Sequence, residues 1–303
     1  MKKAIQTHFW ITFFISPGLL IVSVFILLPL FLSLFNSLFS WNQLIRGTWV
    51  GLENFRRIFF TTPYKERFFN ALQNNAKWFG VTMLIQNTLG LAFGYLLSRR
   101  VPGYGFFRRT FFIPVLFSIV AVGFLWGMYL KPNGLLNIFL TRLGLETYTR
   151  AWLGEEAIAT FSIIAVNIWR WVGFPTLVFL AAIDAIPIDC MEAAYLDGAK
   201  ELQVFRQIVL PLIVPSLTVI TVLTLIGSLN VFEQIYTMTG LDGSPNYSTD
   251  TIGTLFYRTA FGSVDSGNPE IGIGSAIGVI IYLLTFLSSA VFIAFSRSKE
   301  VEL

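Results

Sequence analysis

Arg170 is the residue of this sequence whose charge and surroundings most directly suggest a chemical role. It lies inside a long apolar run and is flanked by Trp169 and Trp171. If that run spans a membrane, a cation near its middle costs about 2.5 to 3.5 kcal/mol, so it must face a wet cavity or a partner. One hypothesis places Arg170 and Trp169 beside a polar path through the membrane. The alternative pairs Arg170 with a carboxylate such as Glu233, or lets it snorkel to the surface.

A second polar cluster closes a later apolar run and contains Asn230, Glu233, Gln234 and Tyr236. Amide, carboxylate and aromatic side chains could hydrogen-bond to a polar ligand and stack on it. The same residue types also form interfacial girdles that anchor a loop at a membrane surface. The sequence therefore offers these residues as candidate ligand contacts, beside that structural alternative.

Enzymatic chemistry finds little support in the residue types present. The sequence has one histidine, His8, and one cysteine, Cys190, and it has no H-E-x-x-H or G-x-S-x-G run. A histidine-based metal site or a nucleophile with its base is therefore not expected. No G-x-x-x-x-G-K-[ST] run occurs either, so any ATP would be hydrolysed by another protein. We expect no catalytic residue, no metal and no cofactor on this chain.

The elements that must position these residues are apolar segments of membrane-spanning length. Of the 303 residues, 55% are hydrophobic and 13% charged, whereas soluble domains have about 25% charged residues. About 20 apolar residues cross the hydrocarbon core as a helix, and continuous runs favour helices over barrel strands. Six runs qualify: Phe9–Leu38, Trp78–Leu97, Thr110–Leu130, Ala157–Ile183, Ile208–Val231 and Ile271–Ser296. The predicted fold class is an all-α membrane protein with six transmembrane helices.

Basic residues orient these predicted spans. The short connection between the second and third spans carries four arginines and no acidic residue: Arg99, Arg100, Arg108 and Arg109. The positive-inside rule places that connection in the cytoplasm, so both termini are expected there and the first run reads as a retained signal-anchor. The net charge of +4 is spread beside the spans without a compact basic patch. Nucleic acid is therefore not an expected partner.

The connection between the fourth and fifth spans, residues 184–209, lies on the same predicted cytoplasmic side and carries helix signals of its own. Pro187 can start a helix through Met191–Tyr195, and Gly198 can end it. Lys200–Ile208 can form a second helix. The first helix and its turn combine small and acidic side chains: Glu192, Ala193, Ala194 and Asp197. These features predict a rigid docking surface, and they do not by themselves name its partner.

The same loop contains a spaced pattern made of Glu192, Ala193, Ala194, Gly198, Ile208, Leu210 and Pro211. This pattern resembles the EAA loop of permease subunits of bacterial binding-protein-dependent ABC importers. Asp197-Gly198-Ala199 with Phe205 is similar to the carbohydrate-uptake branch of that family. There the loop forms coupling helices that fit a cleft on a separate ATPase. The resemblance implies an ATPase-coupling role for Glu192, Ala193, Ala194, Asp197, Gly198, Ala199 and Phe205.

The resemblance extends over most of the chain. Gly51–Phe55 looks like an element of one permease partner of sugar and glycerol-phosphate importers. Tyr257–Phe261 and Gly274–Ala276 are similar to later segments of the family. Where family members often have a tight Thr-Gly-Gly-Gly-Pro run, this chain has the longer Thr239–Pro245, which leaves the local loop geometry open. The resemblance implies the type I ABC importer permease fold.

The function implied by this resemblance is a transmembrane permease subunit of the bacterial inner membrane that carries a sugar, an oligosaccharide or a related polyol or glycerol-phosphate. Implied partners are an extracytoplasmic sugar-binding protein, two ATPase subunits that hold ATP and Mg, membrane lipid, and a second homologous permease that is a different chain. An ion-coupled secondary transporter is the main alternative, although Arg170 is the main buried charge and no internal repeat is evident. A membrane enzyme and a non-transporting scaffold are weaker alternatives.

Three segments follow from this interpretation. Residues 1–70 hold the N-terminal span and an extracytoplasmic segment, residues 71–296 hold a five-helix permease core that includes the loop at 184–209, and residues 297–303 form a cytoplasmic tail. Small residues four apart allow two helices to approach closely. Such pairs are Gly90 with Gly94 and Gly274 with Gly278.

Overall fold

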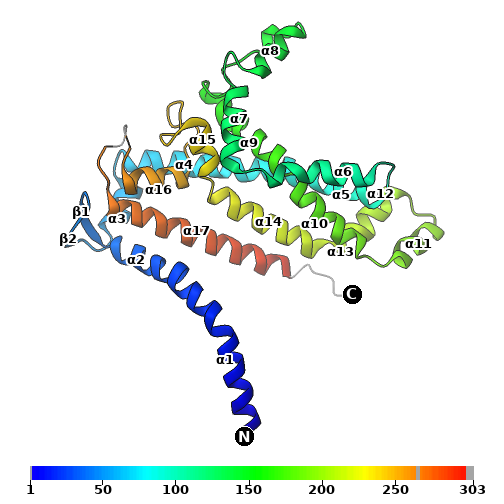
Figure 1. The fold of residues 1–303 in the computed structure, drawn as a ribbon, viewed down its shortest axis with the longest axis horizontal. Helices are drawn as coiled ribbons and strands as arrows, with labels where there is room; N and C mark the ends of the chain where they lie inside the picture. The colour runs from blue at the N-terminus through cyan, green and yellow to red at the C-terminus, as the bar shows by residue number, and fades with distance from the viewer. Residues whose placement is uncertain (1, 264–266, 298–303) are drawn as a thin grey trace. The chain divides into compact units, whose positions relative to one another are not determined.

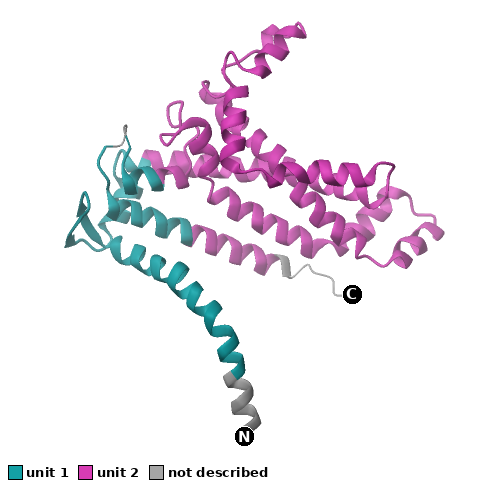
Figure 2. Cartoon of the chain, viewed as in Figure 1, with its two compact units in different colours: residues 1–65, 256–282 teal, residues 66–255, 283–303 magenta. Residues whose placement is uncertain are grey.

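The computed structural model describes residues 2–263 and 267–297, and most of them are helical (Figure 1). Residues 298–303, which make up most of the predicted tail, lie outside the described residues. The chain forms two compact units, residues 1–65 with 256–282 and residues 66–255 with 283–303 (Figure 2). The division of the sequence at residue 70 describes membrane topology and stays a prediction.

The membrane-spanning helices match the predicted number. Three single helices are long and apolar enough to cross a membrane: Trp10–Asn36, Tyr64–Ser98 and Ile271–Phe295. Three bent pairs also qualify: Tyr104–Leu116 with Ile119–Tyr129, Glu156–Trp171 with Gly173–Asp184, and Glu201–Leu212 with Val214–Leu229. With each pair counted as one span, the described residues contain the six spans expected. The helical membrane fold is therefore confirmed.

The first unit begins with one long helical segment made of α1 (Lys2–Val22), η1 (Ser23–Leu27) and α2 (Leu28–Asn36). No residue in its most apolar stretch is buried, as expected of a helix that faces lipid. α3 (Glu53–Phe60), most of α16 (Ile252–Phe261) and the first part of α17 (Ile271–Arg297) complete the unit.

A two-stranded antiparallel sheet follows α2, and the prediction of an all-helical chain did not include it. The strands are β1 (Phe39–Asn42) and β2 (Ile45–Trp49). The rings of Phe39 and Trp49 meet edge to face with centroids 5.2 Å apart. Asn54 of α3 donates to the carbonyl of Phe39 at 2.9 Å and fixes the hairpin to the helix. Strands this short give too little alternation to be recognised in the sequence.

The second unit contains the remaining helices. The second span is one continuous helix that starts well before the predicted Trp78 and consists of α4 (Tyr64–Val81), η2 (Thr82–Asn87) and α5 (Thr88–Ser98). The helices that follow, up to the end of the fourth span, are α6 (Tyr104–Phe112), η3 (Ile113–Leu116), α7 (Ile119–Tyr129), α8 (Leu135–Arg142), η4 (Glu146–Tyr148), α9 (Glu156–Trp171) and α10 (Gly173–Asp184). After the loop come α14 (Val214–Leu229) and α15 (Glu233–Thr239).

The third, fourth and fifth spans are bent, whereas the sequence predicted each as an uninterrupted run. The bends are 96°, 43° and 69° in chain order. A proline ring clashes with the carbonyl four residues earlier and lacks an N–H to donate. Pro175 therefore interrupts the helical hydrogen bonds of the fourth span at Trp171. Pro215 interrupts those of the fifth span near Ile213, where the backbone leaves helical geometry with ψ 7°. In the third span Phe117 is extended, with ψ 143°.

The glycine pairs pack as predicted. A Cβ on Gly90 would lie 2.9 Å from the side chain of Pro175, and a Cβ on Gly94 would lie 3.0 Å from the carbonyl oxygen of Thr176. α5 therefore lies against α10 at backbone distance, which a larger side chain would prevent. In the first unit, a Cβ on Gly274 would lie 2.6 Å from Ala260. The close approach predicted for both pairs is confirmed.

Two buried asparagines on α4 satisfy backbone groups of distant segments. The amide nitrogen of Asn75 donates to the carbonyl of Ser228 at 2.6 Å, and its oxygen accepts from the N–H of Ile252 at 2.9 Å. Asn74 donates to the carbonyl of Asp250 at 2.8 Å. Buried backbone groups need such partners where regular helix bonding ends. These bonds fix α4 to the end of α14 and to the start of α16.

Candidate functional site

The loop between α10 and the fifth span folds as two short helices joined at a glycine. Its elements are α11 (Ile188–Leu196), α12 (Glu201–Val204), η5 (Phe205–Val209) and α13 (Leu210–Leu212). Gly198 has φ +83°, in the left-handed region that glycine adopts without strain. The N–H of Ala199 donates to the carbonyl of Ala194 at 2.9 Å and closes the turn. The predicted helix–glycine–helix arrangement is confirmed.

The residues to which the resemblance assigns coupling divide into two sets. One set is exposed: Glu192, Ala193, Asp197 and Gly198. The other set is half-buried and packs into the hydrophobic core of the second unit: Ala194, Ala199 and Phe205. The sequence pattern did not reveal Leu196 and Leu202, which are 89% and 61% exposed. Large apolar side chains this exposed beside exposed acidic residues form a surface suited to a protein partner.

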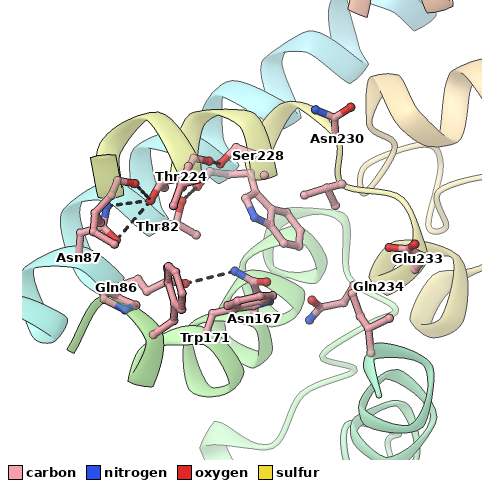
Figure 3. A pocket seen from close by; sticks show the side chains of 18 of the residues that line it. Thr82, Gln86, Asn87, Asn167, Trp171, Thr224, Ser228, Asn230, Glu233 and Gln234 are labelled. Carbon is pink, nitrogen blue, oxygen red and sulfur yellow. Dashed lines mark hydrogen bonds between the residues drawn. The ribbon is translucent and has the colours of Figure 1, made fainter. Parts of the chain in front are cut away.

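A cavity of about 440 Å³ lies among helices of the second unit (Figure 3). Its volume lies within the range of about 300 to 1,000 Å³ typical of small-molecule sites. Its polar and ionisable lining residues are Thr82, Gln86, Asn87, Asn167, Thr224, Ser228, Asn230, Glu233 and Gln234. Its aromatic lining residues are Trp78, Trp171, Phe174 and Phe232. Glu233 is the only ionisable residue among those that line it.

Amide side chains face one another across this cavity. Asn167 of α9 donates to Gln86 of η2 at 3.4 Å, and Asn87 donates to the hydroxyl of Thr224 on α14 at 2.9 Å (Figure 3). Gln234 is 2% exposed and donates to the carbonyl of Ile163 at 3.2 Å, while its own amide oxygen has no hydrogen-bond partner in the described chain. Such an oxygen can accept from a ligand hydroxyl.

The described residues offer little for a bound metal. Within residues 2–263 and 267–297, no group of three or more His, Cys, Asp or Glu side chains lies close enough together to hold a metal ion. The chemistry of the cavity is therefore that of amides, hydroxyls, aromatic rings and one carboxylate. These groups can bind a polar ligand by hydrogen bonding and stacking.

The structure brings only some of the sequence candidates to this cavity. Asn230, Glu233 and Gln234 line it. Tyr236 is not among the lining residues, and its ring stacks on Phe232 with centroids 5.6 Å apart. Trp169 is also absent from the lining and packs edge to face on Trp126 at 5.4 Å. Tyr236 therefore contacts a lining residue, whereas Trp126, the partner of Trp169, is not one of them.

Arg170 has a partner that neither sequence hypothesis named. Its Nε and one terminal nitrogen donate to the carbonyl oxygen of Phe117, at 3.2 and 3.0 Å. Phe117 lies at the break of the third span, where helical bonding stops. The guanidinium carbon also lies 5.0 Å from the ring centroid of Trp171, which lines the cavity. Arg170 is 8% exposed and connects the broken span to the wall of the cavity.

We expect Arg170→Ala to lower the stability of the protein because it leaves the carbonyl of Phe117 without a donor. An unsatisfied buried group costs about 1 to 3 kcal/mol, so the midpoint of thermal unfolding in detergent should fall, and Arg170→Lys should restore part of it. Arg142→Ala is the matched control, because Arg142 is exposed at the end of α8. Equal midpoints for the two alanine variants would contradict this role.

Most of the lining residues were missed by the sequence analysis, although one signal was present. Trp78, Thr82 and Gln86 are spaced four residues apart. That spacing places them on one face of a helix. Asn167 is a single amide in an otherwise apolar segment and carries no such periodic signal.

Comparison with known proteins gives concordant results. The permease protein MalF of the trehalose/maltose transport system of Thermococcus litoralis is 33% identical over 288 residues, 94% of this chain and 93% of that protein. The probable ABC transporter permease protein YurN of Bacillus subtilis is 32% identical over 293 residues, 95% of this chain and 96% of that protein. The crystal structure of a bacterial ABC transporter involved in the import of the acidic polysaccharide alginate contains a chain with TM-score 0.81 and 25% identity, at 98% coverage of both chains.

The family described as "Binding-protein-dependent transport system inner membrane component" matches residues 86–300. That segment includes four whole spans, the last part of the second span, the loop at 184–209 and every residue of the cavity except Trp78 and Thr82. The match supports a permease of an ABC importer and does not support an ion-coupled secondary transporter. The chain belongs to the family of inner-membrane components of binding-protein-dependent transport systems.

Proposed function

We propose that this permease carries a neutral sugar or oligosaccharide across the bacterial inner membrane, with energy from ATP hydrolysis on a separate subunit. The observation that supports this substrate class is the cavity lining. It combines four aromatic rings with amides and hydroxyls, and Glu233 is its only ionisable residue. Such a lining can stack on a sugar ring and bind its hydroxyls.

The charge of the cavity favours a neutral substrate over an anionic one. Glu233 would repel a phosphate or carboxylate group at short range. Arg170, the cation with which Glu233 interacts electrostatically, is not among the lining residues and donates to the carbonyl of Phe117. The glycerol-phosphate that the resemblance left open is therefore disfavoured. The MalF relative belongs to a trehalose/maltose transport system, and both of those sugars are uncharged. The unpaired oxygen of Gln234 adds an acceptor for a hydroxyl.

We expect Trp171→Ala to lower the rate of sugar import because it removes an aromatic surface from the cavity. Aromatic contacts contribute about 0.5 to 1.5 kcal/mol beyond their buried area, which corresponds to a loss of about two- to tenfold. The measurement is sugar uptake into proteoliposomes at saturating binding protein. Trp10→Ala is the matched control, because Trp10 lies on the exposed first span. Unchanged uptake by Trp171→Ala, or equal uptake of a phosphorylated sugar, would contradict the proposal.

The proposed assembly contains two ATPase subunits, a second homologous permease that is a different chain, and an extracytoplasmic sugar-binding protein. ATP and Mg would bind to the ATPase subunits, because this chain has no phosphate-binding loop. The exposed residues Glu192, Asp197 and Leu196 would dock on an ATPase. Closure of the ATPase pair would then move the loop and switch the cavity between outward and inward access, as a rigid-body transition.

We expect Gly198→Val to weaken the association of the ATPase, because valine does not tolerate φ +83°. Gly198→Asn is the matched control, because asparagine visits the left-handed region at lower cost. We expect the valine variant to lose about tenfold in association, from a strain of roughly 1 to 2 kcal/mol. The measurement is the amount of ATPase that copurifies with the tagged permease. Similar amounts of copurified ATPase with both variants would show that docking does not depend on the backbone geometry at Gly198.

Both termini and the loop are proposed to lie in the cytoplasm. Support comes from four arginines, Arg99, Arg100, Arg108 and Arg109, which lie in the connection between the second and third spans. Single cysteines can test this orientation when Cys190 is first replaced by serine. We expect Leu196→Cys, in α11, to react with a membrane-impermeant maleimide only in inverted vesicles. Leu143→Cys, after α8, should react in intact spheroplasts, and the opposite pattern would reverse the topology.

A further inference from the structure

Two neighbouring arginines follow the second span, and their side chains bind two different parts of the coupling loop. Arg99 and Arg100 follow Ser98, the last residue of α5. Arg100 forms an ion pair with Asp184, the last residue of α10, at 3.0 Å. Arg99 forms an ion pair with Glu201, the first residue of α12. The two acidic residues therefore mark the start of the loop and the start of its second helix.

The pair formed by Arg99 includes two tyrosines. Arg99 donates to the hydroxyl of Tyr195 at 2.6 Å and to that of Tyr95 at 2.9 Å. Tyr195 in turn donates to Glu201 at 2.7 Å, and Tyr95 also donates to Glu201. Tyr195 belongs to α11, so the cluster binds the first coupling helix to the second and to the end of α5. Burial alone would lower the pKa of Arg99, but hydrogen bonds with Tyr195, Tyr95 and Glu201 raise it, so the cation is maintained.

The backbone between the two arginines has a conformation that is uncommon for this residue type. Arg100 has φ +51°, at the position after a helix where glycine is favoured. Arg99 keeps φ −75° and ψ 3°. The change of backbone conformation directs the two side chains to different partners. A strained arginine at such a position is consistent with a requirement for its side chain.

We propose that Arg99 and Arg100 form a clamp that holds the coupling loop to the cytoplasmic end of the second span, so that movement of the loop is transmitted to α5. This inference rests on the proposed function. The same long helix carries Gln86 and Asn87 in the cavity lining, and α5 packs closely on α10. A displacement of the loop therefore reaches the cavity through a continuous helix. The clamp residues act by positioning and do not touch the substrate.

The test uses the complete transporter in proteoliposomes and measures sugar imported per ATP hydrolysed. Arg100→Gly removes the ion pair with Asp184 and relieves the backbone at the same time, so a loss cannot be assigned to strain. Arg100→Asp and Asp184→Arg, made singly and together, exchange the charges. Arg109→Gln is the matched control, since among the described residues the exposed Arg109 forms no ion pair.

We expect each single change at Arg100 or Asp184 to lower the ratio by about two- to fivefold, the range of exposed ion pairs. The double exchange should recover most of the loss, and the amount of copurified ATPase should not change. An unchanged ratio in Arg100→Gly would overturn the clamp, as would an equal loss of the ratio in Arg109→Gln. The clamp would also be overturned if the variants at Arg100 or Asp184 copurified less ATPase than the unaltered chain. If no ATPase copurifies with the unaltered chain, it is the proposed function that fails.

Discussion

A helix that breaks inside a membrane exposes backbone carbonyls that lipid cannot satisfy, and this constraint governs the second unit. Three of its spans bend, by 43° to 96°. At the sharpest bend the carbonyl of Phe117 accepts from Arg170, and at the end of α14 the carbonyl of Ser228 accepts from Asn75. Arg170 and Asn75 therefore satisfy backbone carbonyls of other helices. At these two places a donor from another helix replaces the missing helical bond.

The same breaks make room for the cavity. Trp171 and Pro175 lie on the two sides of the break in the fourth span, and both line the cavity. Asn230 follows the end of α14 and Glu233 begins α15, and both line the cavity. Straight helices of apolar residues would fill this space by close packing. The polar cavity of this permease is thus a consequence of interrupted helices whose backbone groups are satisfied elsewhere.

This dependence explains which features could be predicted from the sequence. Six long apolar runs and the helix–glycine–helix loop around Gly198 are local patterns, and the structure confirms both. The start of the second span at Tyr64 was missed because its first turns are polar and pack through Asn74 and Asn75 on distant carbonyls. The hairpin after α2 was missed because its strands are only four and five residues long. For the second span, the deciding contacts join residues far apart in the chain.

The candidate site was predictable in part for the same reason. Asn230 and Glu233 could be found because they cluster in the sequence. The carbonyl that Arg170 binds could not, because it lies at a break in the third span that the apolar run does not reveal. Gly90 and Gly94 were read as packing residues, and they bring α5 against α10. In the proposed mechanism that contact has a second consequence. α10 leads directly into the coupling loop and α5 continues into the cavity wall, so the close packing of two glycines connects the loop to the cavity through rigid helices.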